Sequence, residues 1–525
     1  MTDESHLARY PFATCELGGG MYTSYHRRPL VTASDIAALA LVKLGSGSVW
    51  QGYYMYHGAS QKIGALSTLQ ESHATGYPND CPVITYDFQA PLGEYGQFRD
   101  SYAYLRMQHL WLASDGADLA TMVLTMPPDA PDDTADRRSP RWAVRSDGRS
   151  GFLFVNNHQP VETLPDQENV QFAVELAGRE LVVPSEPVTV PSGAFFVWPL
   201  ARPIGRSILL TATAQPVCVI DGAEPIQVLT QTAGIPVELV FDGDTVTTID
   251  GPATVTGNGD GGGSGGDDDS GNGGKDGKVL VRDLRPGLDC LLRVTAADGS
   301  SAHVLVLDEE SALTATRAKM WGRERLILSS RPAVVDGDRL VLYGGGPGDL
   351  LRVFPGPNKE YDGCEVIELP TPTASAERVV AEVERVEAAG PARRPVIDAA
   401  SGRASAPADQ DFERAAVYRV TVPATLLGSA AEEVLLRLDW SGDVGRAYIG
   451  GRLVADRFWY DPCWEIGLRR FRTELLEHGV IELRLLPFAQ DAPVYVPPRT
   501  RAGRWPLELR SAEFVPVTRT VLETK

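Results

Sequence analysis

The feature that most constrains this chain is a glutamate at the end of a strand pattern, followed at once by three glycines. Glu16 comes after the apolar, β-prone run from Tyr10 to Thr14 and just before Gly18 to Gly20. Glycines let a chain turn sharply and let another group approach the backbone closely. In a (β/α)₈ barrel the C-terminal strand ends carry the catalytic groups, so the pattern is compatible with a catalytic carboxylate. A lone glutamate beside glycines is more often an ordinary turn residue, so the role of Glu16 must be judged from the segments that follow.

A helix and a second strand are predicted after this motif. Residues Ser34 to Leu44 are apolar almost all round, which is typical of a helix buried against a sheet. Thr32 or Ser34 can cap its start and Gly45 can end it. The run from Ser48 to Gly58 is dense in aromatic residues and ends in polar residues and glycine, which predicts a strand. Together with the run before Glu16, these elements form a βα-type unit.

A third segment combines aromatic rings, carboxylates and a turn. It runs from Thr85 to Gln97, and a helix is predicted from about Arg99 to Ala113. Aromatic rings can stack on the apolar face of a sugar, and carboxylates can accept hydrogen bonds from its hydroxyl groups. The apolar side of the helix is interpreted as core packing rather than as a binding stripe.

Three motifs, in the order Cys15–Met21, Tyr54–Gly58 and Tyr86–Gly96, resemble glycoside hydrolase family 35. This is the β-galactosidase family of retaining exo-glycosidases. The third motif is the most specific, since a Tyr-Asp-aromatic-x-Ala-Pro-Leu-x-Glu string is uncommon. The resemblance implies that Glu16 is the nucleophile, on the seventh strand of a (β/α)₈ barrel, and that the second motif is the eighth strand. It also implies a set of substrate-binding residues: Tyr56, Tyr86, Phe88 and Glu94.

The sequence departs from the family pattern in two places. Phe88 stands where family members often carry a tyrosine whose hydroxyl bonds galactose, which leaves only stacking to this side chain. The run from His57 to Gly64 also differs from the family's glycine- and asparagine-containing string after the eighth strand. The second departure leaves the choice of sugar open.

The second catalytic carboxyl of such an enzyme is absent. A retaining glycosidase needs two carboxyl groups about 5–5.5 Å apart, and the family's acid/base lies upstream in an Asn-Glu-Tyr string that occurs nowhere here. Fifteen residues before Glu16 cannot hold six βα units, because one βαβ unit takes roughly 30 residues. We therefore expect the C-terminal portion of such an enzyme. Residues 1–130 are expected to be poorly ordered, or stable only against a chain carrying the missing strands, because two strands leave open edges.

Composition excludes several other classes. The net charge of −20 and the pI near 4.9 argue against a nucleic-acid partner, which would require clustered Lys and Arg. The six cysteines are scattered with no CxxC pair, so neither a metal nor a cofactor is predicted. The sequence contains no run of about 20 apolar residues, so no membrane span is predicted. The first residues lack a signal-peptide pattern, which predicts a cytoplasmic protein, with secretion still open if the true start lies upstream.

The remaining sequence predicts β domains. We expect a partial barrel in residues 1–130, a β domain in 131–204, a second in 205–390, and a jelly-roll, galactose-binding-like domain in 391–525. The Gly/Asp-rich stretch 257–277 is predicted to be a disordered loop, and the alternative of a calcium-binding repeat lacks the required nonapeptide period. Three aromatic residues of the last region form either a sugar-stacking patch or, as favoured, a structural contact: Trp459, Tyr460 and Trp464.

The fold class predicted is thus mainly β and multidomain, with a barrel remnant followed by β-sandwich and jelly-roll domains. The function predicted from the resemblance is the nucleophile-bearing portion of an exo-β-galactosidase, close to inactive alone and acting on a β-galactoside or related carbohydrate. The alternative is a non-catalytic, β-rich carbohydrate-binding or scaffolding protein derived from such an enzyme.

Overall fold

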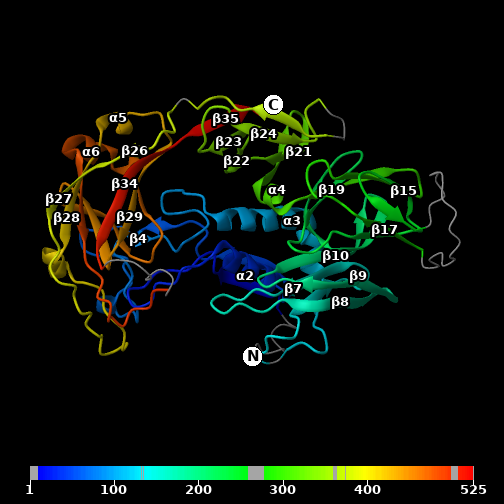
Figure 1. The fold of residues 1–525 in the computed structure, drawn as a ribbon, viewed down its shortest axis with the longest axis horizontal. Helices are drawn as coiled ribbons and strands as arrows, with labels where there is room; N and C mark the ends of the chain where they lie inside the picture. Colours follow the sequence, from blue (N-terminus) through cyan, green and yellow to red (C-terminus); the bar gives the residue numbers. More distant parts are fainter. Residues whose placement is uncertain are drawn as a thin grey trace.

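The computed structural model describes residues 10–131, 133, 135–257, 277–358, 363–372, 374–497 and 506–523. The chain is mainly β, as the sequence predicts. Two β-rich regions lie at opposite ends of the molecule, and the helices α2 and α3 lie between them (Figure 1). A smaller group of strands lies above α3 in this view and includes the end of the chain. The predicted loop at 257–277 falls almost entirely outside the described residues.

The N-terminal segment contains a βαβ unit. Strand β1 (Ala13–Leu17) pairs in parallel with β2 (Trp50–Tyr53), and α2 (Ala33–Gly45) connects them. Thr32 caps α2 in a capping box with Asp35, in agreement with one of the two predicted caps. The remaining elements of this segment are β3 (Ala59–Ser60), which pairs with β4 (Thr85–Tyr86), the 3₁₀ turn η1 (His73–Thr75) and α3 (Asp100–Thr121).

Both helices pack on the sheet that follows them in the chain. Phe152, Phe154 and Val197 of this sheet share one apolar cluster with residues of α2 and α3. The sheet has the order β16-β17-β14-β11-β10-β7-β6-β5. Its strands are β5 (Val123–Thr125), β6 (Trp142–Ser146), β7 (Gly151–Asn156), β10 (Phe195–Ile204), β11 (Ser207–Ala212), β14 (Leu239–Asp242), β16 (Thr254–Thr256) and β17 (Lys278–Arg282).

Arg145 of β6 fastens the ends of both helices to this sheet. Its buried guanidinium donates to the carbonyl oxygen of Leu44 at 2.8 Å, to that of Leu119 at 2.7 Å and to that of Met122 at 2.9 Å. The last carbonyl groups of a helix have no partner within the helix. One side chain therefore donates hydrogen bonds to carbonyl groups at the C-terminal ends of both α2 and α3.

Further sheets extend this region. The hairpin β8 (Gln167–Leu176) and β9 (Arg179–Val190) precedes a five-stranded sheet of order β12-β13-β19-β18-β15. The strands of that sheet are β12 (Ala214–Ile220), β13 (Ile226–Gln231), β15 (Val246–Asp250), β18 (Leu291–Ala296) and β19 (Ser301–Leu307). The short helix α4 (Glu309–Thr314) follows. Next comes a four-stranded sheet made of β20 (Ala315–Met320), β21 (Arg323–Leu328), β24 (Leu350–Phe354) and β25 (Glu365–Glu368).

The last strand of the chain returns to this middle region. Strand β35 (Arg519–Glu523) pairs with β23 (Arg339–Tyr343), which also pairs with β22 (Ala333–Asp336). Leu340, Leu342 and Leu522 lie in one apolar cluster there. The last described strand is therefore joined by backbone hydrogen bonds to a strand that precedes the C-terminal sheets in the sequence.

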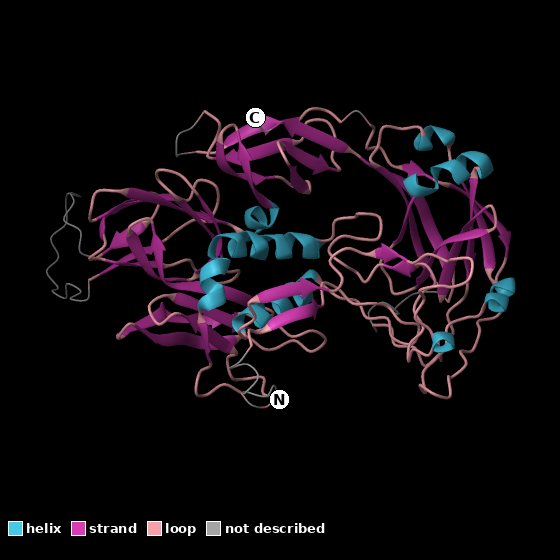
Figure 2. Cartoon of the chain, turned by 180° about the vertical axis from the view of Figure 1, so that it is seen from behind, coloured by secondary structure: helices cyan, strands magenta, loops and turns pink. Residues whose placement is uncertain are grey.

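The C-terminal region has two sheets around one large apolar core. The first has the order β26-β34-β29-β32 and consists of β26 (Val379–Val380), β29 (Glu433–Ser441), β32 (Trp464–Gly467) and β34 (Glu508–Val517). The second has the order β27-β28-β33-β30-β31 and consists of β27 (Glu382–Glu387), β28 (Ala416–Thr421), β30 (Val444–Ile449), β31 (Arg452–Phe458) and β33 (Val480–Leu485). Its helical turns are η2 (Asp409–Arg414), α5 (Ala424–Leu427), η3 (Arg469–Phe471) and α6 (Arg472–His478). The reverse view shows these turns around the edge of the region (Figure 2).

Strand pairs cross two of the expected domain boundaries. β10 and β11 pair across the boundary at 204/205. β26 and β27, which precede residue 390, pair with β34 and β28 of the C-terminal region. The sheets of the described residues are thus grouped differently from the expected residue ranges.

Candidate functional site

One face of the β1–β2 pair is covered by the two helices. Leu17 is buried against Ile36 of α2 and Leu105 of α3. Gln51 donates to the carbonyl oxygen of Ala40 at 2.7 Å, and the hydroxyl group of Tyr53 lies 3.2 Å from Nε2 of His109. This face is therefore the packed side of the strand pair.

The opposite face carries Glu16, Trp50 and Tyr54. Successive residues of a strand point to opposite sides, so Trp50 beside Gln51 faces away from the helices. The pairing of β1 with β2 is irregular between Thr14 and Leu17, and Glu16 lies exposed in this irregular stretch, outside the packed side. The side chain of Trp50 is 61% exposed, that of Tyr54 is 39% exposed, and Glu16 is exposed as well. Parallel sheets are normally covered on both faces. The face around Glu16 is thus an uncovered sheet surface within the described part of the chain.

The glycines after Glu16 bring the three sequence motifs together. A Cβ atom on Gly19 would lie 2.2 Å from the carbonyl oxygen of Met55, in the second motif. A Cβ atom on Gly20 would lie 2.1 Å from the carbonyl oxygen of Phe88, in the third. Any side chain here would collide with backbone, so glycine is required for this close approach.

An aromatic cluster lies where these motifs meet. The ring of Phe88 packs against those of Tyr86, Tyr54 and Tyr22, with centroid distances of 4.6, 5.3 and 5.6 Å. The backbone of Phe88 is in the left-handed region, with φ of 58°, a conformation that is uncommon for a bulky residue. The structure thus brings Tyr86 and Phe88 together with Tyr54, which shares the exposed face with Glu16.

A chain of hydrogen bonds runs through the cluster to Glu71. The hydroxyl group of Tyr86 donates to Oε1 of Glu71 at 2.8 Å and lies 3.1 Å from the hydroxyl group of Tyr54. Burial raises the pKa of Tyr86 well above its ordinary value, and the bonds to Tyr54 and Glu71 raise it further. Sequence reasoning missed Glu71, because it lies in an irregular segment outside all three motifs.

Tyr56 and Glu94, two other predicted substrate-binding residues, lie elsewhere. The ring of Tyr56 packs against those of Tyr53, Tyr102 and His109, on the helix side. The side chain of Glu94 is buried and accepts hydrogen bonds from the hydroxyl groups of Ser60 and Thr85. Neither Tyr56 nor Glu94 belongs to the aromatic cluster around Phe88.

Glu94 is an unusual carboxyl group. Its burial, together with the negative charge of Asp87, raises its pKa from 4.5 to about 7, against the lowering effect of the bonds from Ser60 and Thr85. Arg470 of η3 donates to the carbonyl oxygen of Glu94 at 3.1 Å and to Oγ of Ser60 at 2.6 Å. Glu94 therefore lies at the junction of the third motif with the C-terminal sheets.

The C-terminal sheets hold the third motif in place. Asp456 of β31 accepts hydrogen bonds from the backbone N–H groups of Val83, Ile84 and Thr85, at 2.6 to 3.0 Å. Its carboxyl group is buried, which raises its pKa. This single carboxylate thus positions the backbone that leads into Tyr86 and Phe88.

The predicted aromatic patch of the C-terminal region is not exposed. The side chains of Trp459 and Trp464 are 3% and 2% exposed, and Tyr460 is also buried. Nε1 of Trp459 donates to the carbonyl oxygen of Trp440 at 2.8 Å. The prediction that these three rings form a sugar-stacking patch is therefore wrong. Their burial agrees with the favoured alternative, a structural contact.

Among the described residues, no group of three or more His, Cys, Asp or Glu side chains is placed to hold a metal ion. The helices of the described ranges include none long and apolar enough to cross a membrane. No protein-family model matches the sequence. No curated protein matches it either.

Proposed function

We propose that this chain is the nucleophile-bearing portion of a retaining exo-β-galactosidase. In this proposal β1 and β2 are the last two strands of a (β/α)₈ barrel, and α2 and α3 are helices of its outer layer. The sheets between α3 and β25 supply β-sandwich domains, and the two C-terminal sheets, which include β26 and β27, form a jelly-roll domain that buttresses the barrel. The proposal is supported by the three motifs and by the close contacts of Gly19 and Gly20.

The observation that carries the proposal is the position of Glu16. Its carboxylate stands at the C-terminal end of a parallel strand, on the face away from the helices. In a closed barrel that face would be the interior, and the C-terminal strand ends would form the catalytic mouth. Tyr54, which follows β2, offers a ring for the sugar together with Phe88 and Tyr86 beside it.

Glu16 would attack the anomeric carbon of the galactoside as its bond to the leaving oxygen breaks, giving a covalent glycosyl-enzyme. A second carboxyl group would protonate the leaving oxygen and then, as a base, take a proton from the water that releases the sugar. We assign this second group to a partner chain that carries the missing strands and covers the exposed face. Glu94 supports the third motif instead, because its carboxyl group is occupied by Ser60 and Thr85.

The test uses a chromogenic β-galactoside with the purified chain, alone and mixed with a separately expressed chain carrying the missing barrel strands. The chain alone should be close to inactive, because the loss of a general acid costs about 10²–10⁴-fold. The mixture should be active, and Glu16→Gln should abolish that activity while the exposed control Glu180→Gln leaves it unchanged. Turnover by the chain alone that survives in Glu16→Gln would overturn the assignment.

A covalent trap gives a second readout. A 2-deoxy-2-fluoro galactoside slows the breakdown of a glycosyl-enzyme, so the mixture should acquire one sugar on the peptide that contains Glu16. Label on another carboxylate would reassign the nucleophile. Silence in both assays, with the chain folded, would favour the alternative of a non-catalytic carbohydrate-binding or scaffolding protein.

A further inference from the structure

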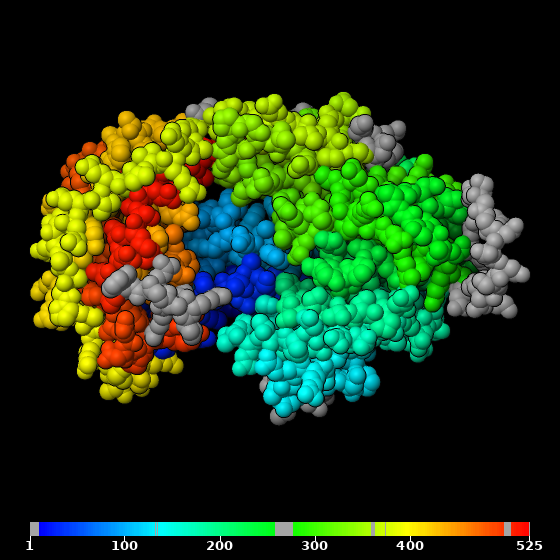
Figure 3. All heavy atoms as spheres, in the orientation of Figure 1, coloured from blue at the N-terminus to red at the C-terminus, as the bar shows by residue number. Residues whose placement is uncertain are grey.

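A cavity of about 200 Å³ lies where the helices α2, α3 and α4 meet the strands β10 and β12. A cavity of roughly 150 Å³ can hold a molecule as large as benzene, so this one has room for a small organic ligand. The exposed residues Ser192 and Gly193 are part of its lining, which places its opening at the surface. The molecule is hollowed where green and teal atoms meet the blue N-terminal elements (Figure 3). Glu16 does not line this cavity, so it differs from the site proposed for catalysis.

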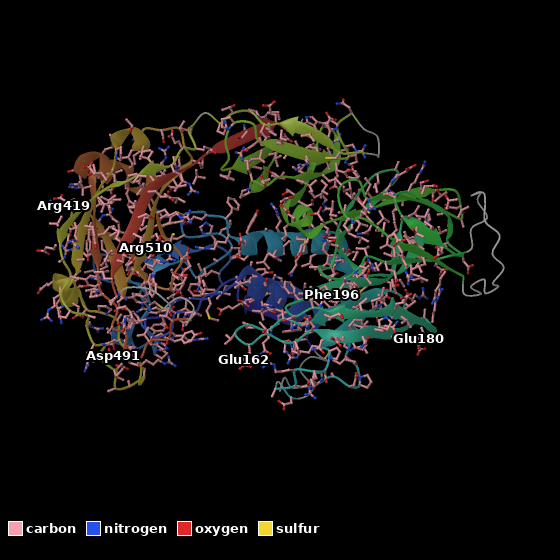
Figure 4. The ribbon with its side chains drawn as sticks, in the orientation of Figure 1. Glu162, Glu180, Phe196, Arg419, Asp491 and Arg510 are labelled. Carbon is pink, nitrogen blue, oxygen red and sulfur yellow. The ribbon has the colours of Figure 1, made fainter. Side chains whose placement is uncertain are left out.

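Three aromatic rings line the cavity, those of Tyr104, Trp111 and Phe195. Phe195 of β10 packs with Trp111 in the apolar cluster between the helices and the sheet. The next residue, Phe196 (Figure 4), lies in the cluster on the other face of the sheet, as the alternation along a strand requires. The face of an aromatic ring attracts a cation. These rings therefore suit a ligand with an apolar body and a positive charge.

Glu309 is the only charged residue in the lining, all of which belongs to the described part of the chain. It stands in the first turn of α4 and is half-buried. Its carboxyl group has neither an ion pair nor a hydrogen bond with another described residue. Burial alone raises its pKa, because no cation of the protein lies close enough to lower it.

Charged groups just outside the lining do not neutralise Glu309. His158 packs against the ring of Phe195, with centroids 5.8 Å apart, but it is paired with Asp35 at 2.9 Å. Arg106 of α3 donates to a carbonyl oxygen at the other end of α4, at 2.7 Å. The residues before and after Glu309 are both acidic. The cavity thus has one carboxylate in excess, which favours a cationic ligand.

A second polar group in the lining lacks a partner. Gln108 of α3 is 7% exposed, and its Nε2 donates to the carbonyl oxygen of Ala37 at 2.9 Å. Its Oε1 is buried and has no hydrogen-bond partner. Leaving a buried acceptor unpaired is unfavourable, and an N–H donor of a ligand would supply the missing bond.

We propose that this cavity binds a small organic cation with a primary ammonium group. The ammonium group pairs with the carboxylate of Glu309 and donates to Oε1 of Gln108, since it carries three donors. The apolar part of the ligand lies against the rings of Tyr104 and Phe195. A quaternary ammonium ion fits less well, because it has no N–H donor for Gln108. The proposal does not depend on catalysis by Glu16.

The test measures binding of three probes of similar shape to the whole chain by titration calorimetry at pH 8: cyclohexylammonium, the neutral cyclohexanol and the anionic cyclohexanecarboxylate. Cyclohexylammonium should bind with saturation, and the other two should bind at least tenfold more weakly. Glu309→Gln should weaken cyclohexylammonium binding by roughly 10- to 100-fold, because hydrogen bonds to charged groups contribute that much. Glu310→Gln is the matched control, since Glu310 is exposed on the same helix and does not line the cavity.

Two further readouts separate loss of binding from loss of folding. Without ligand, Glu309→Gln should melt at or above the temperature of the wild type, because it removes a half-buried charge that has no partner. Cyclohexanol should bind equally to the wild type and to Glu309→Gln. Ala194 lines the cavity as well, so Ala194→Phe should fill it and abolish cyclohexylammonium binding.

Three outcomes would each overturn the proposal. They are equal binding of cyclohexylammonium and cyclohexanol by the wild type, cyclohexylammonium binding that is unchanged in Glu309→Gln, and no saturable binding of cyclohexylammonium at millimolar concentration.

Discussion

Arg28 and Asp443 form a buried ion pair, with Nη2 and Oδ1 2.5 Å apart, although the two residues are 415 positions apart in the chain. The guanidinium of Arg28 is 0% exposed and also donates to the carbonyl oxygens of Tyr25, Asp443 and Trp459. The hydroxyl group of Tyr25 donates to the other oxygen of the same carboxylate at 2.8 Å. The segment after the three glycines is thus fastened to the C-terminal sheets by a fully bonded charge pair.

Replacing Arg28 by Met should destabilise the protein strongly. The variant leaves Asp443 charged, buried and without its cation, which typically costs about 3–5 kcal/mol. Urea unfolding measures the loss in free energy of unfolding. Arg378→Met is the control, because the pair of Arg378 with Glu513 is largely exposed and should cost at most about 1 kcal/mol. Equal effects of the two substitutions would contradict the role assigned to Arg28.

Glu94→Gln should change how stability depends on pH. The native pKa near 7 exceeds the ordinary value of 4.5, so between these values the folded chain holds a proton that the unfolded chain has released. This contribution to the free energy of unfolding is present below about pH 4.5 and is lost as the pH rises to about 7. From pH 5 to pH 8 it should fall by an amount on the order of 2–3 kcal/mol.

Urea unfolding of the wild type and of Glu94→Gln at pH 5 and pH 8 measures this difference. Other buried carboxyl groups, such as Asp456, titrate in both proteins, so only the difference between the two is informative. Glu180→Gln is the exposed control and should follow the wild type. A difference that is the same at both pH values would show that Glu94 titrates at its ordinary pKa.

Gly20→Ala and Gly116→Ala should have opposite effects. The added methyl group at residue 20 would lie 2.1 Å from the carbonyl oxygen of Phe88, and such overpacking typically costs about 1–3 kcal/mol. At residue 116, within α3, the nearest atom is 3.6 Å away, and alanine should stabilise the helix by roughly 0.5–1 kcal/mol. Thermal denaturation compares the two. A Gly20→Ala variant as stable as the wild type would exclude the close approach of the first and third motifs.

Trp50→Ser should separate folding from association. Because Trp50 is largely exposed in the chain alone, its loss should change the free energy of unfolding by no more than about 0.5 kcal/mol. In the complementation assay the concentration of partner chain needed for half-maximal activity should rise at least tenfold, since buried aromatic anchors contribute about 2 kcal/mol or more. Val380→Ser, exposed on β26, is the control. Unchanged complementation would place the partner elsewhere.

Local patterns in the sequence were sufficient to predict helices and strands but not how these elements pack against one another. The helix predicted from Ser34 to Leu44 lies within α2. The strand predicted over Ser48 to Gly58 is shorter, because β2 ends at Tyr53 and the chain then turns. Tyr54 leaves the strand to join the ring of Phe88. Aromatic residues favour a strand on average, and here tertiary contacts override that preference.

The surroundings of the site depend on contacts that no local pattern encodes. Asp456 binds the backbone just before the third motif, and Arg470 binds Ser60 and Glu94, all from more than 370 residues away. The high pKa of Glu94 comes from its burial at this junction, and neither a short motif nor composition reveals burial. The same is true of Trp464, whose ring could have been either exposed or packed.

The pairing of β35 with β23 has a consequence for synthesis. Thr518, just before β35, donates to the carbonyl oxygen of Gly345, 173 residues earlier in the chain. Ribosomes add roughly 5–20 residues per second, so several seconds to half a minute pass before the partner of β23 is made. During that interval the open edge of β23 is a site where a nascent chain could pair wrongly. The order of translation, and not only the final energy, therefore bears on how this protein reaches its fold.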